Sequence, residues 1–252
     1  MPPYARSDAL SGTATIVTGA ARGIGRGIAE ALIERGGQVL LVDIDESVTK
    51  VADEIGGRAL VTDIRTDDAP ARIIDAAVAA FGRLDALVNN AIALGVGAFH
   101  EQDDDAFDLA FDTGPRATFR LMRAAFPHLV AAGGGSVVNF GSSAGTEGEP
   151  GFATYGGAKE AIRGLSKTAA LEWAPLGIRV NVISPFANSD GMKAWAVADP
   201  ETYGAAVAKV PMRRIGDVRD DIGAMVAFLI GAESTYLTGQ TIRVDGGRSG
   251  MR

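Results

Sequence analysis

Two kinds of segment alternate along the chain, from residue 14 almost to its end. The first kind is a short, continuous run of apolar and mostly β-branched residues, which is typical of a strand buried on both faces of a sheet. These runs predict seven strands, over residues 14–18, 39–42, 59–61, 86–88, 136–140, 178–183 and 241–244.

The second kind lies between the strands and carries apolar residues at intervals of three and four, as one face of a helix does. These segments predict helices over residues 24–35, 47–55, 69–81, 104–132, 154–173 and 217–230. Strands that alternate with helices, and that are apolar throughout, favour a doubly wound, seven-stranded parallel sheet with helices on both faces. We expect an α/β protein with a single domain over residues 1–252, because no linker, repeat or low-complexity tract divides the chain.

Residues 186–215 break this rhythm after the sixth predicted strand. Ligands of such sheets bind beyond the carboxyl ends of the strands, so we predict that this segment is a lid over the substrate. Packing within the chain or a subunit interface explains its large apolar side chains equally well. These side chains are Phe186, Met192, Trp195, Val197, Tyr203 and Met212.

A glycine-rich turn joins the first predicted strand to the first predicted helix. Gly19 allows a tight turn, Gly23 lets the backbone approach a diphosphate, and Gly25 permits close packing of helix on strand. The start of the helix supplies free N–H groups and the positive end of its dipole. Spaced glycines alone also occur in turns that bind nothing, and the strand–turn–helix context is what favours a dinucleotide site.

Acidic and amide side chains follow the next strands. Asp43 ends the second strand, where a carboxylate accepts hydrogen bonds from both hydroxyls of an adenosine ribose and repels the 2′-phosphate of NADP. Arg22 in the glycine turn favours the opposite choice, but the position of Asp43 at the ribose favours NAD. Asp63 and Ile64 are placed to border the adenine, and the segment Asn89-Asn90-Ala91 to tie strands together beside the cofactor.

Three residues point to proton chemistry. Tyr155 and Lys159 are four residues apart on one predicted helix and therefore share a face, and Ser142 follows the fifth predicted strand. A phenol exchanges a proton with a carbinol oxygen when its pKa falls from about 10 toward 7, which a nearby ammonium and a positive nicotinamide ring favour. A serine hydroxyl can donate a hydrogen bond to the substrate oxygen. A tyrosine and a lysine at this spacing also occur often by chance.

Composition narrows the class of protein. The 24 basic and 31 acidic side chains give a net charge of −7, so we expect neither nucleic acid nor an anionic membrane as a partner. There is no cysteine, and the two histidines are His100 and His128, so we expect no metal site. No apolar stretch reaches about 18 residues, and the first residues do not read as a secretion signal, so we expect a cytoplasmic protein.

The order and spacing of these motifs resemble the short-chain dehydrogenase/reductase family over essentially the whole chain. The resemblance implies a Rossmann fold, a nicotinamide cofactor and a homotetramer or homodimer. It also implies that Tyr155 is the general acid/base, that Lys159 lowers its pKa and holds the nicotinamide ribose, and that Ser142 orients the substrate. The matching segments are Thr18-Gly19-x-x-x-Gly23-x-Gly25, Asp63, Asn89-Asn90-Ala91, Ser142, Tyr155-x-x-x-Lys159, Arg179-x-Asn181 and Tyr236 to Gly247.

Three positions depart from the family pattern. Ile92 replaces the glycine that usually follows Asn-Asn-Ala, and Phe186 replaces the glycine that usually follows Pro185. Gly114 stands where the family has an asparagine that holds a water in a proton relay to the lysine. Pro115 beside it should kink or interrupt the predicted helix, and we hypothesise that freed carbonyl groups or Thr113 take over the relay.

We therefore expect an NAD(H)-dependent oxidoreductase that interconverts a secondary alcohol and a carbonyl compound. The substrate should be neutral and apolar, since no arginine or lysine cluster marks a receptor for a carboxylate. The predicted substrate contacts are Ile92, Ser142, Phe186, Met192 and Trp195. The predicted cofactor contacts are Gly19, Arg22, Gly23, Ile24, Gly25, Asp43, Asp63, Ile64, Asn89, Ala91, Tyr155, Lys159 and Pro185.

Two alternatives stay open. The departures at Gly114, Ile92 and Phe186 suggest a non-catalytic sensor or scaffold that binds a dinucleotide, although such a protein does not need the Ser142–Tyr155 pair. The other alternative is an NADPH-dependent 3-ketoacyl-thioester reductase. Asp43 disfavours it, and so does the acidic chain, which would repel an acidic carrier protein.

Overall fold

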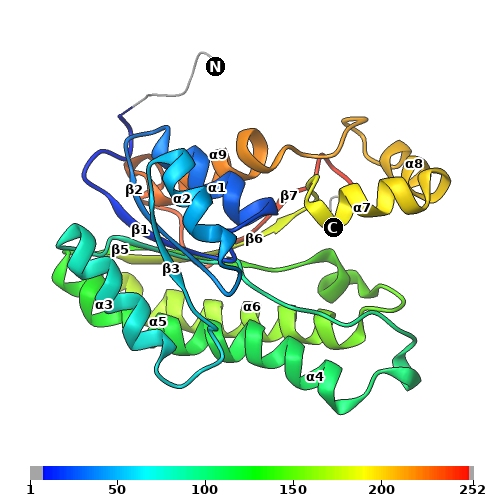
Figure 1. Cartoon of the computed structure of the whole chain (residues 1–252), viewed down its shortest axis with the longest axis horizontal. Coiled ribbons are helices and arrows are strands. Elements are labelled where there is room, and N and C mark those ends of the chain that lie inside the picture. Colours follow the sequence, from blue (N-terminus) through cyan, green and yellow to red (C-terminus); the bar gives the residue numbers. More distant parts are fainter. Residues whose placement is uncertain (1–7, 250–252) are drawn as a thin grey trace.

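Seven parallel strands form one sheet in the computed structural model, which describes residues 8–249 (Figure 1). Their order across the sheet is β3-β2-β1-β4-β5-β6-β7, so the direction of winding reverses between β1 and β4. The predicted α/β fold with a doubly wound parallel sheet is confirmed. The strands are β1 Ala14–Thr18, β2 Gln38–Asp43, β3 Arg58–Val61, β4 Ala86–Asn89, β5 Gly135–Phe140, β6 Ile178–Pro185 and β7 Thr241–Val244.

Helices cover both faces of the sheet, with α1, α2 and α9 on one face and α3, α5 and α6 on the other (Figure 1). The helices are α1 Gly23–Ile33, α2 Ser47–Ile55, α3 Ala69–Phe81, α4 Asp104–Phe111, α5 Ala117–Ala131, α6 Ala153–Trp173, α7 Asp190–Ala198, α8 Pro200–Ala208 and α9 Ala224–Ile230. Short helical turns are η1 Phe99–Glu101, η2 Asp112–Arg116, η3 Ala144–Gly148, η4 Ala174–Leu176, η5 Val218–Gly223 and η6 Ala232–Ser234.

Successive strand residues enter two separate cores. In β1, Ile16 packs into the core beneath α3, α5 and α6, whereas Val17 packs into the core beneath α1, α2 and α9. Leu40 and Leu41 of β2 divide between the same two cores. All four side chains are almost fully buried. Because side chains alternate across a strand, a strand covered on both faces has to be apolar at every position, which explains the continuous runs in the sequence.

The long helix predicted over residues 104–132 is interrupted in the middle. It consists of α4, the π-helical turn η2 and α5, and η2 contains Gly114 and Pro115, both buried. Proline has no N–H group to donate to the preceding turn, so the regular hydrogen-bond ladder cannot continue through it. The N–H of Ala117 instead donates to the carbonyl of Asp112, five residues back. The interruption expected at Gly114 and Pro115 is therefore observed.

The segment 186–215 leaves the carboxyl end of β6 and carries α7 and α8, which lie together at one end of the molecule (Figure 1). The N–H of Phe186 donates to the carbonyl of Val244 at its start, and Gly216 donates to Phe186 at its end. Both ends of the segment are thus tied to the sheet. Within residues 8–249, no helix has the length and hydropathy needed to span a membrane, and a cytoplasmic location stays a prediction.

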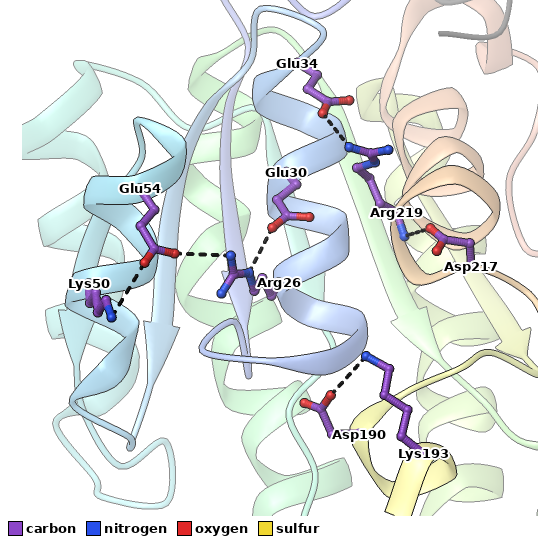
Figure 2. Close-up of polar contacts among 9 residues, drawn as sticks. All are labelled: Arg26, Glu30, Glu34, Lys50, Glu54, Asp190, Lys193, Asp217 and Arg219. Carbon is purple, nitrogen blue, oxygen red and sulfur yellow. Dashed lines mark hydrogen bonds and ion pairs between the residues drawn. The ribbon is translucent and has the colours of Figure 1, made fainter. Parts of the chain in front are cut away.

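Helix α1 and η5 approach each other more closely than side chains would allow. A Cβ atom on Gly27 would lie 2.7 Å from the carbonyl carbon of Val218, and one on Gly223 would lie 2.5 Å from the Cβ of Ala31. An ion pair between Arg219 and Glu34 at 3.1 Å closes the same contact at the surface (Figure 2). The two glycines therefore set the distance between these elements.

We expect Gly27→Ala to lower the free energy of unfolding by about 1–3 kcal/mol, because backbone atoms have to move apart. This loss should appear although alanine favours a helix by about 1 kcal/mol over glycine. Chemical denaturation measures the change. Gly204→Ala is the control, since a Cβ on this glycine of α8 would have no atom within 4 Å. A Gly27→Ala protein as stable as that control would contradict the close approach.

Candidate active site

A cavity of about 630 Å³ opens at the carboxyl ends of the central strands, where the winding of the sheet reverses. Its wall includes the turn after β1, the ends of β2 and β3, the segments after β4, β5 and β6, and part of α6. The reversal leaves a crevice there because the crossover connections on its two sides run to opposite faces. The predicted nucleotide residues and the predicted chemical residues meet in this one cavity.

The glycine turn is shaped by backbone contacts. Gly19 and Gly23 have φ angles of +67° and +56°, which side chains other than glycine rarely adopt. A Cβ on Gly25 would lie 2.1 Å from the carbonyl oxygen of Gly19, so only glycine lets α1 begin this close to β1. Gly19, Arg22 and Ile24 line the cavity, whereas Gly23 and Gly25 do not. Gly23 and Gly25 therefore determine the shape of the turn without lining the cavity themselves.

Asn90 holds this turn from the neighbouring strand. Its side-chain amide donates to the carbonyl oxygens of Thr18 and Gly19, at 2.8 and 3.2 Å. The hydroxyl oxygen of Thr18 in turn accepts from the N–H groups of Asn90 and Ala91, both at 3.1 Å. Asn90 and Ala91 both line the cavity. Sequence analysis placed Asn90 beside the cofactor without a contact role, because nothing in the sequence shows which strand its amide reaches.

Asp43 closes the turn from the other side. One carboxylate oxygen accepts from the N–H of Ala21 at 2.9 Å, and the other accepts from the N–H of Asp45 at 3.0 Å. Each oxygen keeps a further lone pair, and the side chain lines the cavity. The carboxylate is therefore held in place by backbone donors and still able to accept hydrogen bonds from a ligand.

The far edge of the cavity carries an ion pair that the sequence analysis did not include. Asp63 and Ile64 line the wall as predicted, and so does Arg65, whose guanidinium lies 2.7 Å from the Asp63 carboxylate. This guanidinium donates hydrogen bonds to the Asp63 carboxyl and lowers its pKa. Arg65 was missed because a lone arginine in a loop gives no signal of the direction it takes.

Asn89 lies outside the cavity, which differs from its predicted role as a cofactor contact. Its amide donates to the side-chain oxygen of Asn139 at 2.8 Å, and the Asn139 amide donates to the Ser166 hydroxyl at 2.8 Å. The Ser166 hydroxyl donates to the carbonyl of Ile162. This buried chain of hydrogen bonds connects β4, β5 and α6. Asn89 is thus placed to fix α6 against the sheet, a distinction that the spacing of a motif does not make.

Ser142, Tyr155 and Lys159 all line the cavity. Tyr155 and Lys159 face it from the first two turns of α6, and the Lys159 nitrogen lies 5.5 Å from the centre of the Tyr155 ring. The Ser142 hydroxyl oxygen accepts from the N–H of Ala144 at 3.2 Å, which leaves its own proton free to donate. A substrate oxygen in this cavity can therefore meet both the Ser142 and the Tyr155 hydroxyl.

Burial has the largest effect on the pKa of Lys159 and on the pKa of Tyr155. Lys159 is only 3% exposed, and burial lowers the pKa of its ammonium group to about 7. Burial also raises the pKa of Tyr155, an effect that the nearby Ser142 hydroxyl opposes. The lowered tyrosine pKa expected from Lys159 is thus not present in the protein alone. Burial thus weakens the positive charge that Lys159 can hold beside Tyr155.

The segment after β4 rests on the interrupted helix. Ile92 and Thr113 both line the cavity, and the Thr113 hydroxyl accepts from the N–H of Ala93 at 2.9 Å. The same hydroxyl donates to the carbonyl of Leu109 at 2.6 Å. Its proton is therefore committed within the helix, which argues against the hypothesis that Thr113 donates in a proton relay. Leu109, which the sequence analysis did not include, adds a further apolar contact to the same wall.

Only the start of the segment 186–215, which was predicted to be a lid, lines the cavity. Pro185, Phe186 and Met192 line the wall as predicted. Trp195 does not line it, and instead packs edge-on against Tyr203 of α8, with ring centres 5.5 Å apart. Trp195 lies one turn of helix beyond Met192, and its side chain packs α7 against α8. The prediction that Trp195 contacts substrate finds no support in this geometry.

The lid also places charges at the start of α1. Asp190 and Lys193 of α7 form an ion pair at 3.5 Å beside the glycine turn (Figure 2). A Cβ on Gly23 would lie 3.8 Å from an oxygen of the Asp190 carboxylate. On the outer side of α1, Arg26 bridges Glu30 and Glu54, which ties α1 to α2. No group of three or more potential metal ligands occurs among residues 8–249.

Comparison with known proteins places this geometry among nucleotide-dependent oxidoreductases. A family model described as "Enoyl-(Acyl carrier protein) reductase" matches residues 19–249. "Oxidoreductase UcpA" of Escherichia coli is 38% identical, over 94% of this chain and 95% of that protein. The 12alpha-hydroxysteroid dehydrogenase of a Clostridium species is 37% identical, over 94% of this chain and 97% of that protein. The crystal structure of a putative short-chain alcohol dehydrogenase from Sinorhizobium meliloti is 34% identical, with a TM-score of 0.90 over 96% of this chain and 98% of that one.

The lowered pKa of Lys159 predicts how the free energy of unfolding depends on pH. Its folded value of about 7 lies below the usual 10.5, so the unfolded chain binds the proton more tightly between these two values. The free energy of unfolding should therefore rise as the pH is raised from about 7 to 10. Below pH 7 the lysine is charged in both states, and the folded protein bears the whole cost of burying that charge. We expect Lys159→Met to stabilise the protein at pH 6 by several kcal/mol, at most about 5, and to flatten this rise.

Denaturation at pH 6, 7, 8 and 9 measures the difference between variant and wild type. Lys167→Met removes an exposed lysine from the same helix and serves as the control, with no such change expected. A Lys159→Met protein that keeps the pH dependence of the wild type would show that the ammonium is not held in a dry site.

Proposed function

The chain belongs to the short-chain dehydrogenase/reductase family, and from this premise we propose that it transfers a hydride between NAD(H) and a secondary alcohol or ketone. The observation that carries the proposal is the meeting of Ser142, Tyr155 and Lys159 with the glycine turn in one cavity. A protein that only senses or binds a dinucleotide needs the turn but not the hydroxyl pair. We therefore favour an enzyme over the sensor or scaffold.

The cavity wall fits a nicotinamide dinucleotide. The open turn at Gly19 and the uncapped start of α1, which has no acidic residue in its first turn, suit a diphosphate. The fixed Asp43 carboxylate would accept from the hydroxyls of the adenosine ribose. Asp63 and Ile64 would border the adenine, and Pro185 and Ala91 the nicotinamide half. These assignments favour NAD over NADP, because a 2′-phosphate beside Asp43 would be repelled.

Tyr155 would move the proton at the substrate oxygen. An oxidised nicotinamide bound here would supply the acceptor for the hydride of the carbinol carbon, and its ring would add a positive charge to the cavity. Burial raises the pKa of Tyr155 in the protein, and the Ser142 hydroxyl opposes this effect. The positive ring, together with the Lys159 ammonium, would lower the pKa of Tyr155 further. The phenolate then takes the alcohol proton, while Ser142 donates a hydrogen bond to the same oxygen. The reaction yields a ketone, reduced cofactor and one proton.

The lining around these hydroxyls favours a neutral, apolar substrate. The cavity wall includes four large apolar side chains, which are Ile92, Leu109, Phe186 and Met192. The two arginines that line the cavity, Arg22 and Arg65, lie at the nucleotide end. An apolar wall with two convergent hydroxyls is typical of a site for a small uncharged molecule.

A 3-ketoacyl-thioester reductase that uses NADPH is the second candidate. The matching family model carries an acyl-carrier-protein reductase in its description, which favours it. Asp43 and the net charge of −7 count against it, since both an adenosine 2′-phosphate and an acidic carrier protein would be repelled. The choice of nucleotide therefore separates the two candidates.

The outer face of α5 and α6 supports the predicted homo-oligomer. It forms a shallow apolar groove where Phe126 and Trp173 pack with ring centres 5.0 Å apart. Phe119 also lines the groove and is 44% exposed, and Leu171 of α6 is 80% exposed. Apolar side chains of this size on one helical face are typical of a surface that another subunit covers. We propose a dimer or tetramer formed through these helices.

We expect wild-type protein to reduce NAD with neutral secondary alcohols, and Tyr155→Phe to lower kcat at least about 100-fold, because the proton then has no acceptor. The increase in absorbance at 340 nm over a panel of such alcohols measures both. Ser142→Ala should also be slow, with the apparent Kd for NAD little changed. Turnover that survives Tyr155→Phe would refute the acid/base role, and a panel without any turnover would favour the sensor.

We expect the wild type to prefer NAD over NADP, and Asp43→Asn to raise kcat/KM for NADP about 10-fold or more, because the amide removes the charge that repels the 2′-phosphate. The asparagine side-chain oxygen can still accept from the N–H of Ala21. Asp45→Asn removes the same charge two residues away and should leave the preference unchanged. Faster turnover of the wild type with NADP would reject the assignment of Asp43 and favour the ketoacyl reductase.

A further inference from the structure

Ile92 of the cavity wall lies next to Gly114 of η2, which does not itself line the cavity. Ile92 lines the cavity from the segment after β4, and Gly114 lies opposite it in η2. A Cβ atom on Gly114 would lie 3.1 Å from Cδ1 of Ile92 and 3.6 Å from its Cγ1. The isoleucine side chain therefore occupies the space that a side chain at position 114 would need.

Helix α6 also limits the space around Gly114, and a hydrogen bond holds the segment after β4 against η2. The same Cβ on Gly114 would lie 3.6 Å from the Cβ of Ala158, the residue before Lys159. The Thr113 hydroxyl accepts from the N–H of Ala93 and so holds the segment after β4 against η2. Ile92 thus has η2 beside it and also lines the open cavity, while α6 limits the space around Gly114.

We propose that Ile92 sets the depth of the substrate pocket, and that Gly114 is the residue that allows its side chain to lie that deep. This inference rests on the proposed function. An atom added at position 114 has to push Ile92 toward the cavity, because that is its open side. Atoms removed from Ile92 deepen the pocket instead. A substrate substituent that lies over Ile92 is therefore limited in size by the two residues together.

The substitutions have opposite expected signs. The quantity to measure is the ratio of kcat/KM for a secondary alcohol with a bulky substituent to kcat/KM for 2-butanol. Ile92→Ala should raise this ratio by about 10-fold, since one methylene in an apolar pocket already changes such ratios by that amount. Gly114→Ala should lower the same ratio. In the double variant Gly114→Ala/Ile92→Val, the valine lacks Cδ1, the atom nearest the added methyl group, so the ratio should return toward that of the wild type.

Thermal unfolding tests the same contact without any turnover. Gly114→Ala should lower Tm by several degrees, and Gly114→Ala/Ile92→Val should recover most of that loss. Ile92→Val alone should lower Tm only slightly. Gly204→Ala, which adds a methyl group where a Cβ meets no atom within 4 Å, should leave Tm at or above that of the wild type.

An active wild type whose ratio is unchanged in Ile92→Ala would overturn this inference and leave the proposed function intact. A double variant no better than Gly114→Ala, in ratio and in Tm, would overturn it as well. A wild type that oxidises no alcohol of the panel with either nucleotide overturns the proposed function and the pocket role with it. Opposite changes in the two single variants, together with recovery in the double variant, support it.

Discussion

The ammonium group of Lys159 lies at the bottom of the cavity almost without solvent, and the rest of the site is built around this buried charge. Removing a charge from water is costly, so burial lowers the pKa of this ammonium group to about 7. Helix α6 has to hold it there against that cost. The buried hydrogen bonds from Asn89 through Asn139 to Ser166 give α6 this support from the two central strands.

Backbone contacts, more than side chains, shape the nucleotide end of the cavity. Gly25 lets α1 start against the carbonyl of Gly19, and Asn90 and Asp43 hold the turn from the strands on either side. None of these contacts depends on a bound ligand. The turn is therefore held by the protein's own hydrogen bonds, from the strands on both sides.

Much of the fold could be predicted from the sequence because burial on both faces leaves a plain pattern in each strand. The proline at position 115 likewise predicted the interruption in the long helix, since it lacks an N–H group. The directions of single side chains could not be predicted, because they depend on packing between distant segments. Asn89 faces the core although it belongs to a motif beside the cavity, Trp195 lies one turn beyond the wall, and Arg65 joins the wall without a sequence signal. The contact of Ile92 with Gly114 joins positions 22 residues apart, which only the assembled fold brings together.

The packing of Trp195 against Tyr203 gives the lid a natural optical label. The chain has two tryptophans, and the other, Trp173, packs on Phe126 at the end of α6, in the groove outside the cavity. Each indole is thus attached to a different part of the molecule. With Trp173 replaced by phenylalanine, the remaining indole fluorescence comes from α7, so the surroundings of this helix can be followed without an attached dye.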